Sequence, residues 1–581
     1  MSKNIVICSD GTGNSAIKGR GTNVFKIFEC VDLNGHRYDH ALTVQLAIYD
    51  DGVGTESFRP LRMLGGAAGW GLSRNVKQLY EELCRIYDPG DRIFLFGFSR
   101  GAFTVRTLAG LITTCGIINA TQRSRSSDVS ASSGSAAVEI QNSQQLRTLV
   151  DKAYKILRRC FRTWLMRALF GPPTKGESKA FRRAHCHGNE KIAFVGVWDT
   201  VDAVGLPLNI ANVVNTFIYQ FKFPNYELSP DVERGYHALA IDDERQSFHP
   251  LLWDQRKENQ GQIIEQVWFT GVHSNVGGGY PRQGMSLVPL DWLMQKAEST
   301  GLRFVAEERK YYRDHANVDD KLYNSRAGIA LFYRWLPRDI AKLCAKNNVP
   351  PVLHSTVLER ITHGTENYRP GNLPGNASVV FTRSGEDDKD DAAHARAKAL
   401  QKVLSEAHSK LPSVPVNGSL LDSVRRYVHI GRLSYRVFLL TVIGLIVTAA
   451  ALIHPAASLG WSLLTSIAKL LFGLIGSPID TSIAIARALV DTPWAIASIS
   501  VGSLLALLLS WWSGRGMDRA FSQFWFKEQQ ALRRELKRTR LKPRTATAGQ
   551  ERGVTEDTTP SLTESERLAH GRAARVVEES R

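Results

Sequence analysis

The sequence predicts a doubly wound α/β fold with a mostly parallel sheet, followed by a C-terminal helical transmembrane hairpin. In the first 300 residues, short apolar runs alternate with helical patterns, as in parallel sheets covered by helices on both faces. Polar clusters directly follow these apolar runs, where ligands bind in such sheets. Further along, no Asp, Glu, Lys or Arg occurs from Val437 to Ala468 or from Thr492 to Gly514.

The sheet is expected to contain short strands that are buried on both faces, because each run is continuously apolar. We expect these strands at Asn4–Cys8, Thr43–Tyr49, Arg92–Phe96, Lys191–Trp198 and Ile263–Phe269. Helices are expected between them, at Val76–Tyr87 and Gly101–Cys115. A chain of 581 residues exceeds one ordinary domain, so further regions should follow the sheet.

The chain is accordingly divided into four regions. They are an α/β domain at 1–300 with an insertion at 119–190, a helical accessory region at 301–430, a transmembrane hairpin at 431–515, and a basic, partly disordered tail at 516–581. Within the insertion, the Ser-rich residues 121–145 predict a flexible linker. Residues 157–170 predict a basic amphipathic helix, which suits either a membrane interface or lid, or packing on the core.

The membrane spans are expected at Val437–Ile453 and Pro493–Trp512, which are long enough to cross about 30 Å of hydrocarbon. Basic residues precede the first span and follow the second, so the positive-inside rule places both ends in the cytoplasm. The segment Leu459–Ile475 is either a further span or an interfacial helix. The alternative for the pair is a buried helical hairpin of a soluble protein.

The formal net charge of +17 favours an anionic partner. The sequence has no zinc-finger spacing or RNA-binding signature, so we expect a lipid bilayer and no nucleic acid. The cysteines are scattered without a paired framework, which favours reduced thiols in the cytosol. The triplet His185-Cys186-His187 lacks further ligands at a usual spacing, so no metal is expected.

The segment Gly97-Phe-Ser-Arg-Gly101 contains a Gly-x-Ser-x-Gly motif. The motif follows an apolar strand and precedes a helical pattern, which is the context of the nucleophile elbow in α/β-hydrolase-like folds. Small residues at Gly97 and Gly101 permit a tight turn that exposes the serine at a helix N-terminus. We therefore expect Ser99 to be a nucleophile.

A serine hydroxyl needs a base, and the base needs an orienting acid. His273 follows the strand that ends at Phe269, and Asp199 follows the strand that ends at Trp198. Both occur in the chain order Ser, Asp, His that such hydrolases use. Asp202 and Asp242 remain alternatives for the acid. His237 and His249 are weaker candidates for the base, because neither is expected to close a strand.

The oxyanion hole is expected to use the backbone N–H of Arg100, directly after the nucleophile. A second N–H should come from the turn after the first strand, at Gly11 or Thr12. Asp10 lies in the same turn. Its carboxylate either caps the turn or binds substrate.

Seven motifs in this order resemble those of the α/β-hydrolase family that includes type VI secretion phospholipase effectors. They are Ser9-Asp-Gly-Thr-Gly-Asn14, Thr22-Asn-Val24, Tyr49-Asp-Asp-Gly-Val-Gly54, Gly97-Phe-Ser-Arg-Gly-Ala102, Val197-Trp-Asp-Thr-Val201, His237-Ala-Leu-Ala-Ile-Asp-Asp-Glu-Arg245 and Gly271-Val-His-Ser-Asn-Val-Gly-Gly-Gly-Tyr280. The resemblance covers about 1–300. It implies a triad at Ser99, Asp199 and His273, and phospholipid ester hydrolysis for the effector members. Asn275 departs from the family's usual Asp in His-Ser-Asp-Val, which alters local hydrogen bonding and leaves the triad positions intact.

Together these observations predict a membrane-associated serine esterase that hydrolyses phospholipids without a metal or organic cofactor. We expect it in the inner membrane, with the catalytic domain in the cytoplasm. One alternative is a secreted antibacterial phospholipase toxin, which would have an immunity or adaptor protein as a partner. Another is a non-catalytic membrane scaffold that keeps the hydrolase fold.

Overall fold

The computed structural model describes most of the chain up to residue 538. The described residues are 2–11, 21–51, 68–120, 135–160, 176–188, 190–201, 227–255, 261–326, 336–368, 372–382, 401–403, 418–453 and 492–538, with the single or paired residues 333, 370, 399, 406, 480, 483–484 and 487. Residues 1–539 form one compact unit. The predicted segment Leu459–Ile475 and the tail beyond 538 lie outside the described residues.

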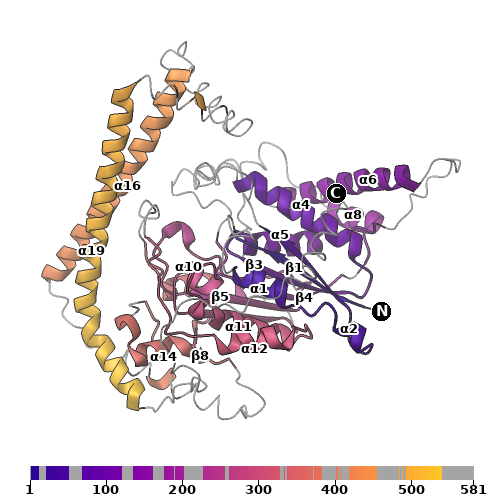
Figure 1. The fold of residues 1–581 in the computed structure, drawn as a ribbon, viewed down its shortest axis with the longest axis horizontal. Coiled ribbons are helices and arrows are strands. Elements are labelled where there is room, and N and C mark those ends of the chain that lie inside the picture. The colour runs from indigo at the N-terminus through magenta and orange to yellow at the C-terminus, as the bar shows by residue number, and fades with distance from the viewer. Residues whose placement is uncertain are drawn as a thin grey trace, which may run out of the picture. The chain divides into compact units, whose positions relative to one another are not determined.

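An eight-stranded sheet forms the centre of the α/β region, and every pairing between its strands is parallel (Figure 1). Its spatial order is β2-β1-β3-β4-β5-β6-β7-β8. The strands are β1 (Asn4–Ser9), β2 (Gln45–Asp50), β3 (Arg92–Phe98), β4 (Ile192–Trp198), β5 (Arg234–Ala240), β6 (Ile263–Phe269), β7 (Val352–His354) and β8 (Ser378–Val380). The five strands expected from the apolar runs are all present, which confirms the predicted parallel α/β sheet.

Three strands were not expected from the sequence. Strand β5 carries Arg234, Gly235 and His237, so its sequence is not a continuous apolar run, although it is buried between β4 and β6. Strands β7 and β8 have three residues each, too few for a periodic pattern. Both belong to the region expected to be a helical accessory, which therefore contributes two strands to the main sheet.

Helices cover both faces of the sheet (Figure 1). One face is covered by α4 (Ala68–Ile86), α5 (Arg100–Cys115), α6 (Ser135–Cys160) and α8 (Glu177–His185), and the other by α1 (Asn23–Cys30) and α11 (Gly284–Glu298). Side chains along β1 point alternately to the two faces of the sheet, so each face carries apolar residues that helices can cover. Ile5 and Ile7 belong to one buried cluster, and Val6 and Cys8 belong to the other. Because both faces are buried, the strand is apolar throughout.

The strand order reverses between β1 and β3. The chain passes from β1 outward to β2 on one side, and then from β3 onward to the strands on the other. Ligands of open α/β sheets bind at such a switch point, beyond the carboxyl ends of the strands. In this protein those ends are the segments that follow Ser9 and Phe98.

The remaining helices are shorter, apart from the C-terminal pair. They are α2 (Gly35–Tyr38), α10 (His273–Gly277), α12 (Ala306–Asp314), α13 (Ile340–Asn347) and α14 (Ser355–His363), with the 3-10 turns η1 (Gln246–Phe248) and η4 (Thr365–Asn367). Helix α6 begins at Ser135, so the predicted flexible linker at 121–145 was wrong for its last part. The predicted amphipathic helix at 157–170 is described only as far as Cys160, at the end of α6.

Helices α16 (Gly418–Ile453) and α19 (Pro493–Arg538) pack against each other in antiparallel directions. The Ser513 hydroxyl donates to the Tyr427 carbonyl, and the Ser434 hydroxyl donates to the Ala506 carbonyl, each at 2.7 Å. By length and apolar composition, Arg426–Ala449 and Pro493–Met517 are each sufficient to cross a membrane.

Candidate active site

Ser99 lies in a sharp turn between β3 and α5. Its backbone has φ 59° and ψ −119°, a strained conformation for a residue with a side chain. A Cβ atom at Gly101 would lie 2.0 Å from the Ser9 carbonyl oxygen, and one at Gly97 would lie 2.6 Å from the Ala102 Cα. Only glycine therefore allows the elbow to close against the end of β1.

A continuous hydrogen-bond chain joins Ser99, His273 and Asp199. The Ser99 Oγ lies 2.8 Å from the His273 Nε2, and the His273 Nδ1 lies 2.6 Å from the Asp199 Oδ2. All three side chains are buried. Ser99 follows β3, Asp199 follows β4, and His273 begins α10 after β6. The parallel sheet thus brings together residues up to 174 positions apart.

The imidazole of His273 is held from several sides. Phe98 lies 4.6 Å from it between ring centroids, and Phe248 contacts it edge-on at 5.0 Å. Asp243 accepts a hydrogen bond from the backbone N–H of His273 at 3.2 Å, and the same carboxylate binds the guanidinium of Arg245. Burial lowers the pKa of His273, against the opposing effect of Asp199. A lowered pKa keeps the imidazole neutral, as a general base must be.

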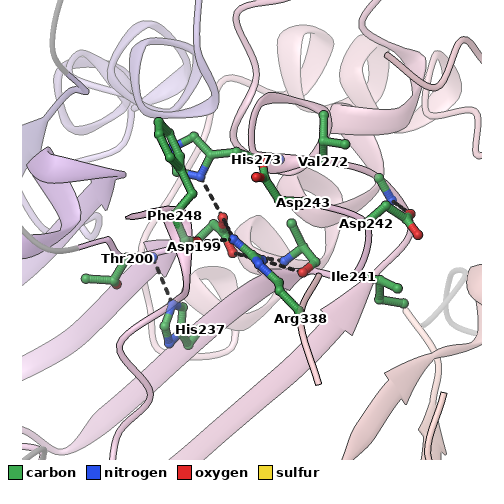
Figure 2. A network of polar contacts seen from close by, with 12 residues as sticks. Asp199, Thr200, His237, Ile241, Asp242, Asp243, Phe248, Val272, His273 and Arg338 are labelled. Atoms are coloured by element: carbon green, nitrogen blue, oxygen red, sulfur yellow. Dashed lines mark hydrogen bonds and ion pairs between the residues drawn. The ribbon is translucent and has the colours of Figure 1, made fainter. Parts of the chain in front are cut away.

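Asp199 is fully buried, which alone would raise its pKa. The guanidinium of Arg338 and the hydrogen bond to His273 instead hold the pKa of Asp199 well below its usual range. The Arg338 Nη1 lies 2.7 Å from the Asp199 Oδ1, and the Nη2 lies 2.8 Å from the Oδ2 (Figure 2). The Ala240 backbone N–H also donates to the Asp199 Oδ1, at 3.0 Å.

Sequence reasoning missed Arg338 and Asp243. Arg338 precedes α13 and lies 139 residues from Asp199, and no local pattern marks it. Asp243 lies within the recognised motif His237–Arg245, and that motif was the sequence feature from which its role could have been suspected. Both residues act next to the predicted triad: Arg338 binds its carboxylate, and Asp243 binds the backbone of its histidine.

The two alternative acids do not take the position of Asp199. Asp242 accepts from the Gly271 N–H at 2.7 Å and from the Tyr368 hydroxyl at 2.9 Å, so it braces the turn before α10. Burial raises the pKa of Asp242 to about 6. Asp202 lies outside the described residues.

The two weaker candidates for the base have other partners. The Nε2 of His237 accepts from the Thr200 N–H at 3.1 Å (Figure 2), and its Nδ1 faces the Gln266 Oε1 at 3.4 Å. Burial lowers the pKa of His237 to about 3, which agrees with a neutral ring that supports the loop after Asp199. His249 lies 2.8 Å from the Leu336 carbonyl through its Nε2.

The expected oxyanion donors lie at the switch point. Arg100 is the first residue of α5, where a backbone N–H has no intrahelical acceptor. The Gly11 N–H donates to the Asp10 Oδ1 at 2.5 Å, and Thr12 lies outside the described residues. In this structure the Gly11 donor is therefore engaged by the neighbouring carboxylate.

Asp10 has the contacts of a turn-forming residue. Besides the Gly11 N–H, its carboxylate accepts from the Thr22 hydroxyl at 2.5 Å and from the Tyr49 hydroxyl at 2.8 Å. These contacts tie the end of β1 to α1 and β2. The contact with the Gly11 N–H is of the kind that caps a turn, and the contacts with Thr22 and Tyr49 are tertiary, so both roles considered for Asp10 stay open.

Asn275 has partners that account for its departure from the family pattern. Its Nδ2 donates to the Lys321 carbonyl at 3.1 Å, and its Oδ1 accepts from the Tyr323 N–H at 3.2 Å. A carboxylate would not supply the donor. The amide therefore fits the segment 321–323, which lies beyond the region that carries the recognised motifs.

No three His, Cys, Asp or Glu side chains gather as metal ligands within the described ranges. Around Ser99, a serine hydroxyl, an imidazole with a lowered pKa and a carboxylate with a lowered pKa are joined in one hydrogen-bond chain. Such a set is suited to acyl transfer.

The chain is similar to two proteins that are themselves described as uncharacterized. It is 26% identical over 266 residues to "Uncharacterized protein YEL023C" of Saccharomyces cerevisiae, covering 43% of this chain and 33% of the yeast protein. The chain thus matches about a third of the length of that curated relative. A crystal structure of an uncharacterized protein from Pseudomonas aeruginosa shares 17% identity with a TM-score of 0.30, over 71% of this chain and 60% of that one.

The family comparison is more informative, because it extends over the whole segment that carries the seven motifs. The family model described as "T6SS, Phospholipase effector Tle1-like, catalytic domain" matches residues 3–296, about half of the chain. The resemblance seen in the sequence is thereby confirmed, and this protein belongs to the Tle1-like phospholipase effector family.

Proposed function

We propose that this protein is a membrane-associated serine hydrolase with an α/β-hydrolase-type catalytic domain that cleaves carboxylic esters of phospholipids. The hydrogen-bond chain from Ser99 through His273 to Asp199 is the observation that carries the proposal. Its place at the switch point of a parallel sheet and membership of a phospholipase effector family both support it.

In the proposed reaction, the Ser99 Oγ attacks the acyl carbonyl carbon while the His273 Nε2 accepts the hydroxyl proton. Asp199 stabilises the resulting imidazolium through the Nδ1 proton. The Arg100 N–H donates to the oxyanion, together with a second donor expected at Thr12, or at Gly11 once its N–H leaves the Asp10 carboxylate. His273 then returns the proton to the leaving alcohol, and water hydrolyses the acyl-enzyme with His273 again as the base.

The C-terminal helices favour a lipid substrate. Apolar side chains of α16 and α19 face outward: Leu440 is 68% exposed, Val501 65% and Leu508 54%. Helices in the core of a soluble protein would bury such residues. We propose that these helices form a hairpin in the inner membrane. Basic residues at both outer ends favour the cytoplasmic side for the catalytic domain, next to phospholipid.

A second candidate role follows from the family description, which names secreted effectors. In that case the same hydrolase would act on the membrane of a target cell, and a partner immunity protein would protect the producer. The chemistry at Ser99 is the same in both roles. The orientation of the hairpin in the producing cell distinguishes them.

The central test is hydrolysis of phospholipid vesicles by the purified full-length chain. Vesicles of phosphatidylethanolamine and phosphatidylglycerol should release fatty acid, and a fluorophosphonate probe should label Ser99. The Ser99→Ala variant should lose activity by at least about 10³-fold, because the nucleophile is removed. Ser73→Ala is a matched control, because the Ser73 hydroxyl lies on α4 and donates to the Tyr154 hydroxyl of α6 at 3.0 Å. It should retain the wild-type rate.

Two results would refute the proposal. Full activity of Ser99→Ala would show that another group performs the chemistry. An unlabelled, inactive wild-type protein that is correctly folded would instead favour the non-catalytic membrane scaffold.

A further inference from the structure

Arg338 is a fully buried cation in direct contact with the acid of the proposed triad. It lies outside residues 3–296, the segment that the family model matches. The residue directly precedes Asp339, which caps α13 by accepting from the Lys342 N–H at 3.0 Å. The side chain of Arg338 thus leaves an anchored segment and lies against Asp199, as Figure 2 shows.

With Arg338 in place, the Asp199 carboxylate has every acceptor position filled. Its Oδ1 accepts from Arg338 and from the Ala240 N–H, and its Oδ2 accepts from Arg338 and from His273. A carboxylate has about four lone-pair positions, so four donors fix its plane and its rotation. These contacts fix the orientation of the Asp199 Oδ2 toward His273, and the guanidinium also stabilises the negative charge of the carboxylate.

Arg338 also holds the backbone on the other side of His273. Its Nη2 donates to the Phe248 carbonyl at 2.5 Å, and its Nη1 donates to the Ala240 carbonyl. Phe248 is the residue whose ring packs edge-on against the His273 imidazole. The Arg338 guanidinium therefore orients the Asp199 carboxylate and holds the backbone of Phe248, whose ring packs against His273.

We propose that Arg338 is a positioning residue for the acyl transfer at Ser99, which sets the geometry of Asp199 and His273 and supplies the counterion of the Asp199 carboxylate. The inference rests on the proposed function. It assigns a role in catalysis to a residue that lies beyond the segment matched by the family model.

The electrostatic part of the role follows from the local charges. Among the described residues, the charged groups that act on His273 are Asp199, Asp243 and Arg245, and Arg338 acts in turn on Asp199 and Asp243. Asp243 is paired with Arg245 by two hydrogen bonds. Removal of the Arg338 charge leaves the Asp199 charge without its main counterion. The His273–Asp199 pair then takes up a proton at higher pH, whichever of the two receives it.

The experiment compares Arg338→Lys and Arg338→Met in the full-length protein with a soluble short-chain ester as substrate. Arg338→Met should lower kcat at least about tenfold. It should also shift the acid limb, the fall of kcat/KM at low pH, upward by about one pH unit. Arg338→Lys keeps the positive charge and loses the bidentate hydrogen bonding to the Asp199 carboxylate. It should lower kcat with the acid limb nearly unmoved.

Arg360→Met is the matched control. Arg360 is also fully buried in the C-terminal part of the domain, where it binds the Asp320 carbonyl at 2.7 Å and Glu366 at 2.6 Å. Its loss should lower the melting temperature, and because Arg360 acts on Asp242 rather than on Asp199 or His273, any shift of the acid limb should be smaller than in Arg338→Met. Rates are normalised to the fraction of Ser99 labelled by fluorophosphonate, so unfolded protein does not contribute.

The outcomes separate this inference from the proposed function. An active wild-type enzyme whose Arg338→Met variant keeps the wild-type kcat and acid limb, with only a lower melting temperature, overturns the role of Arg338. Wild-type kcat in Arg338→Lys contradicts the geometric part in the same way, even where Arg338→Met fails to fold. A wild-type protein that is neither labelled nor active refutes the proposed function itself.

Discussion

Asp199 and Asp242 are both buried near the site, and their pKa values are shifted in opposite directions because their partners differ. Burial acts on both Asp199 and Asp242 and would raise the pKa of each. Asp242 has neutral donors, the Gly271 N–H and the Tyr368 hydroxyl, and its pKa rises to about 6. Asp199 has a guanidinium at 2.7 Å, and its pKa falls. Of these two carboxylates, only Asp199 is therefore stabilised as an anion, next to the proposed base His273.

The pH dependence of activity follows from His273. As the proposed base, His273 must be neutral to accept the Ser99 proton, and burial lowers its pKa from the usual value of about 6.5. The neutral form therefore persists below that value. We expect kcat/KM for a soluble ester to be flat near neutral pH and to fall only below about pH 6.5.

Rates measured between about pH 5 and 9 test this expectation. Asp199→Asn serves as a comparison, because it removes the orienting charge with little change of shape and should lower kcat by about 10⁴-fold. A wild-type acid limb centred above about pH 7 would contradict a lowered pKa for His273.

At the level of elements, the elbow depends on close contact between α5 and the end of β1. The Ser99 N–H donates to the Trp198 carbonyl at 3.1 Å, which ties the elbow to β4 as well. The strained Ser99 backbone is thus held by two neighbouring strands. A disturbance of this contact should misplace the nucleophile before it unfolds the sheet.

Gly101→Ala tests this contact. The added Cβ would meet the Ser9 carbonyl oxygen at 2.0 Å, and a backbone atom cannot move aside without a shift of α5 or β1. We expect a loss of about 1–3 kcal/mol in the free energy of unfolding, by urea titration. Because a displacement of about 1 Å misaligns Ser99, kcat/KM should fall about 100-fold.

The matched control for this substitution is Gly188→Ala, because a Cβ at Gly188 meets no atom within 4 Å. That variant should retain the stability and activity of the wild type. An unchanged kcat/KM in Gly101→Ala would mean that the contact with β1 does not position the elbow.

For the whole molecule, the sequence was most informative where the chemistry is local. The strand, elbow and helix around Ser99 adjoin one another, so composition and spacing sufficed to predict them. Strand β5 was missed because its polar residues are satisfied by tertiary partners, as His237 is by Thr200 and Gln266. Arg338 was missed because its function depends on a contact 139 residues away. Such a contact has no periodic or motif signal in a single sequence.

The extent of the catalytic domain is therefore a question about the whole chain. Residues beyond 296 add β7 and β8 to the sheet and contribute buried side chains, among them Ile340, Leu353, Val357, Leu358 and Ile361. They also supply Arg338. A chain that ends at residue 296 would expose the edge of β6 and leave the Asp199 charge buried without its counterion, which destabilises by about 3–5 kcal/mol.

We expect the fragment 1–296 to be insoluble or unlabelled by fluorophosphonate, although it contains all three proposed triad residues. The fragment 1–417 keeps the whole sheet and Arg338 and lacks α16 and α19. It should hydrolyse a soluble ester at a rate near that of the full chain and should bind vesicles weakly, because the exposed apolar helices are gone. Labelling, ester hydrolysis and vesicle sedimentation of the two fragments measure these differences. A soluble 1–296 fragment with full ester activity would show that the matched segment is sufficient, and that the last two strands and Arg338 contribute nothing essential to the site.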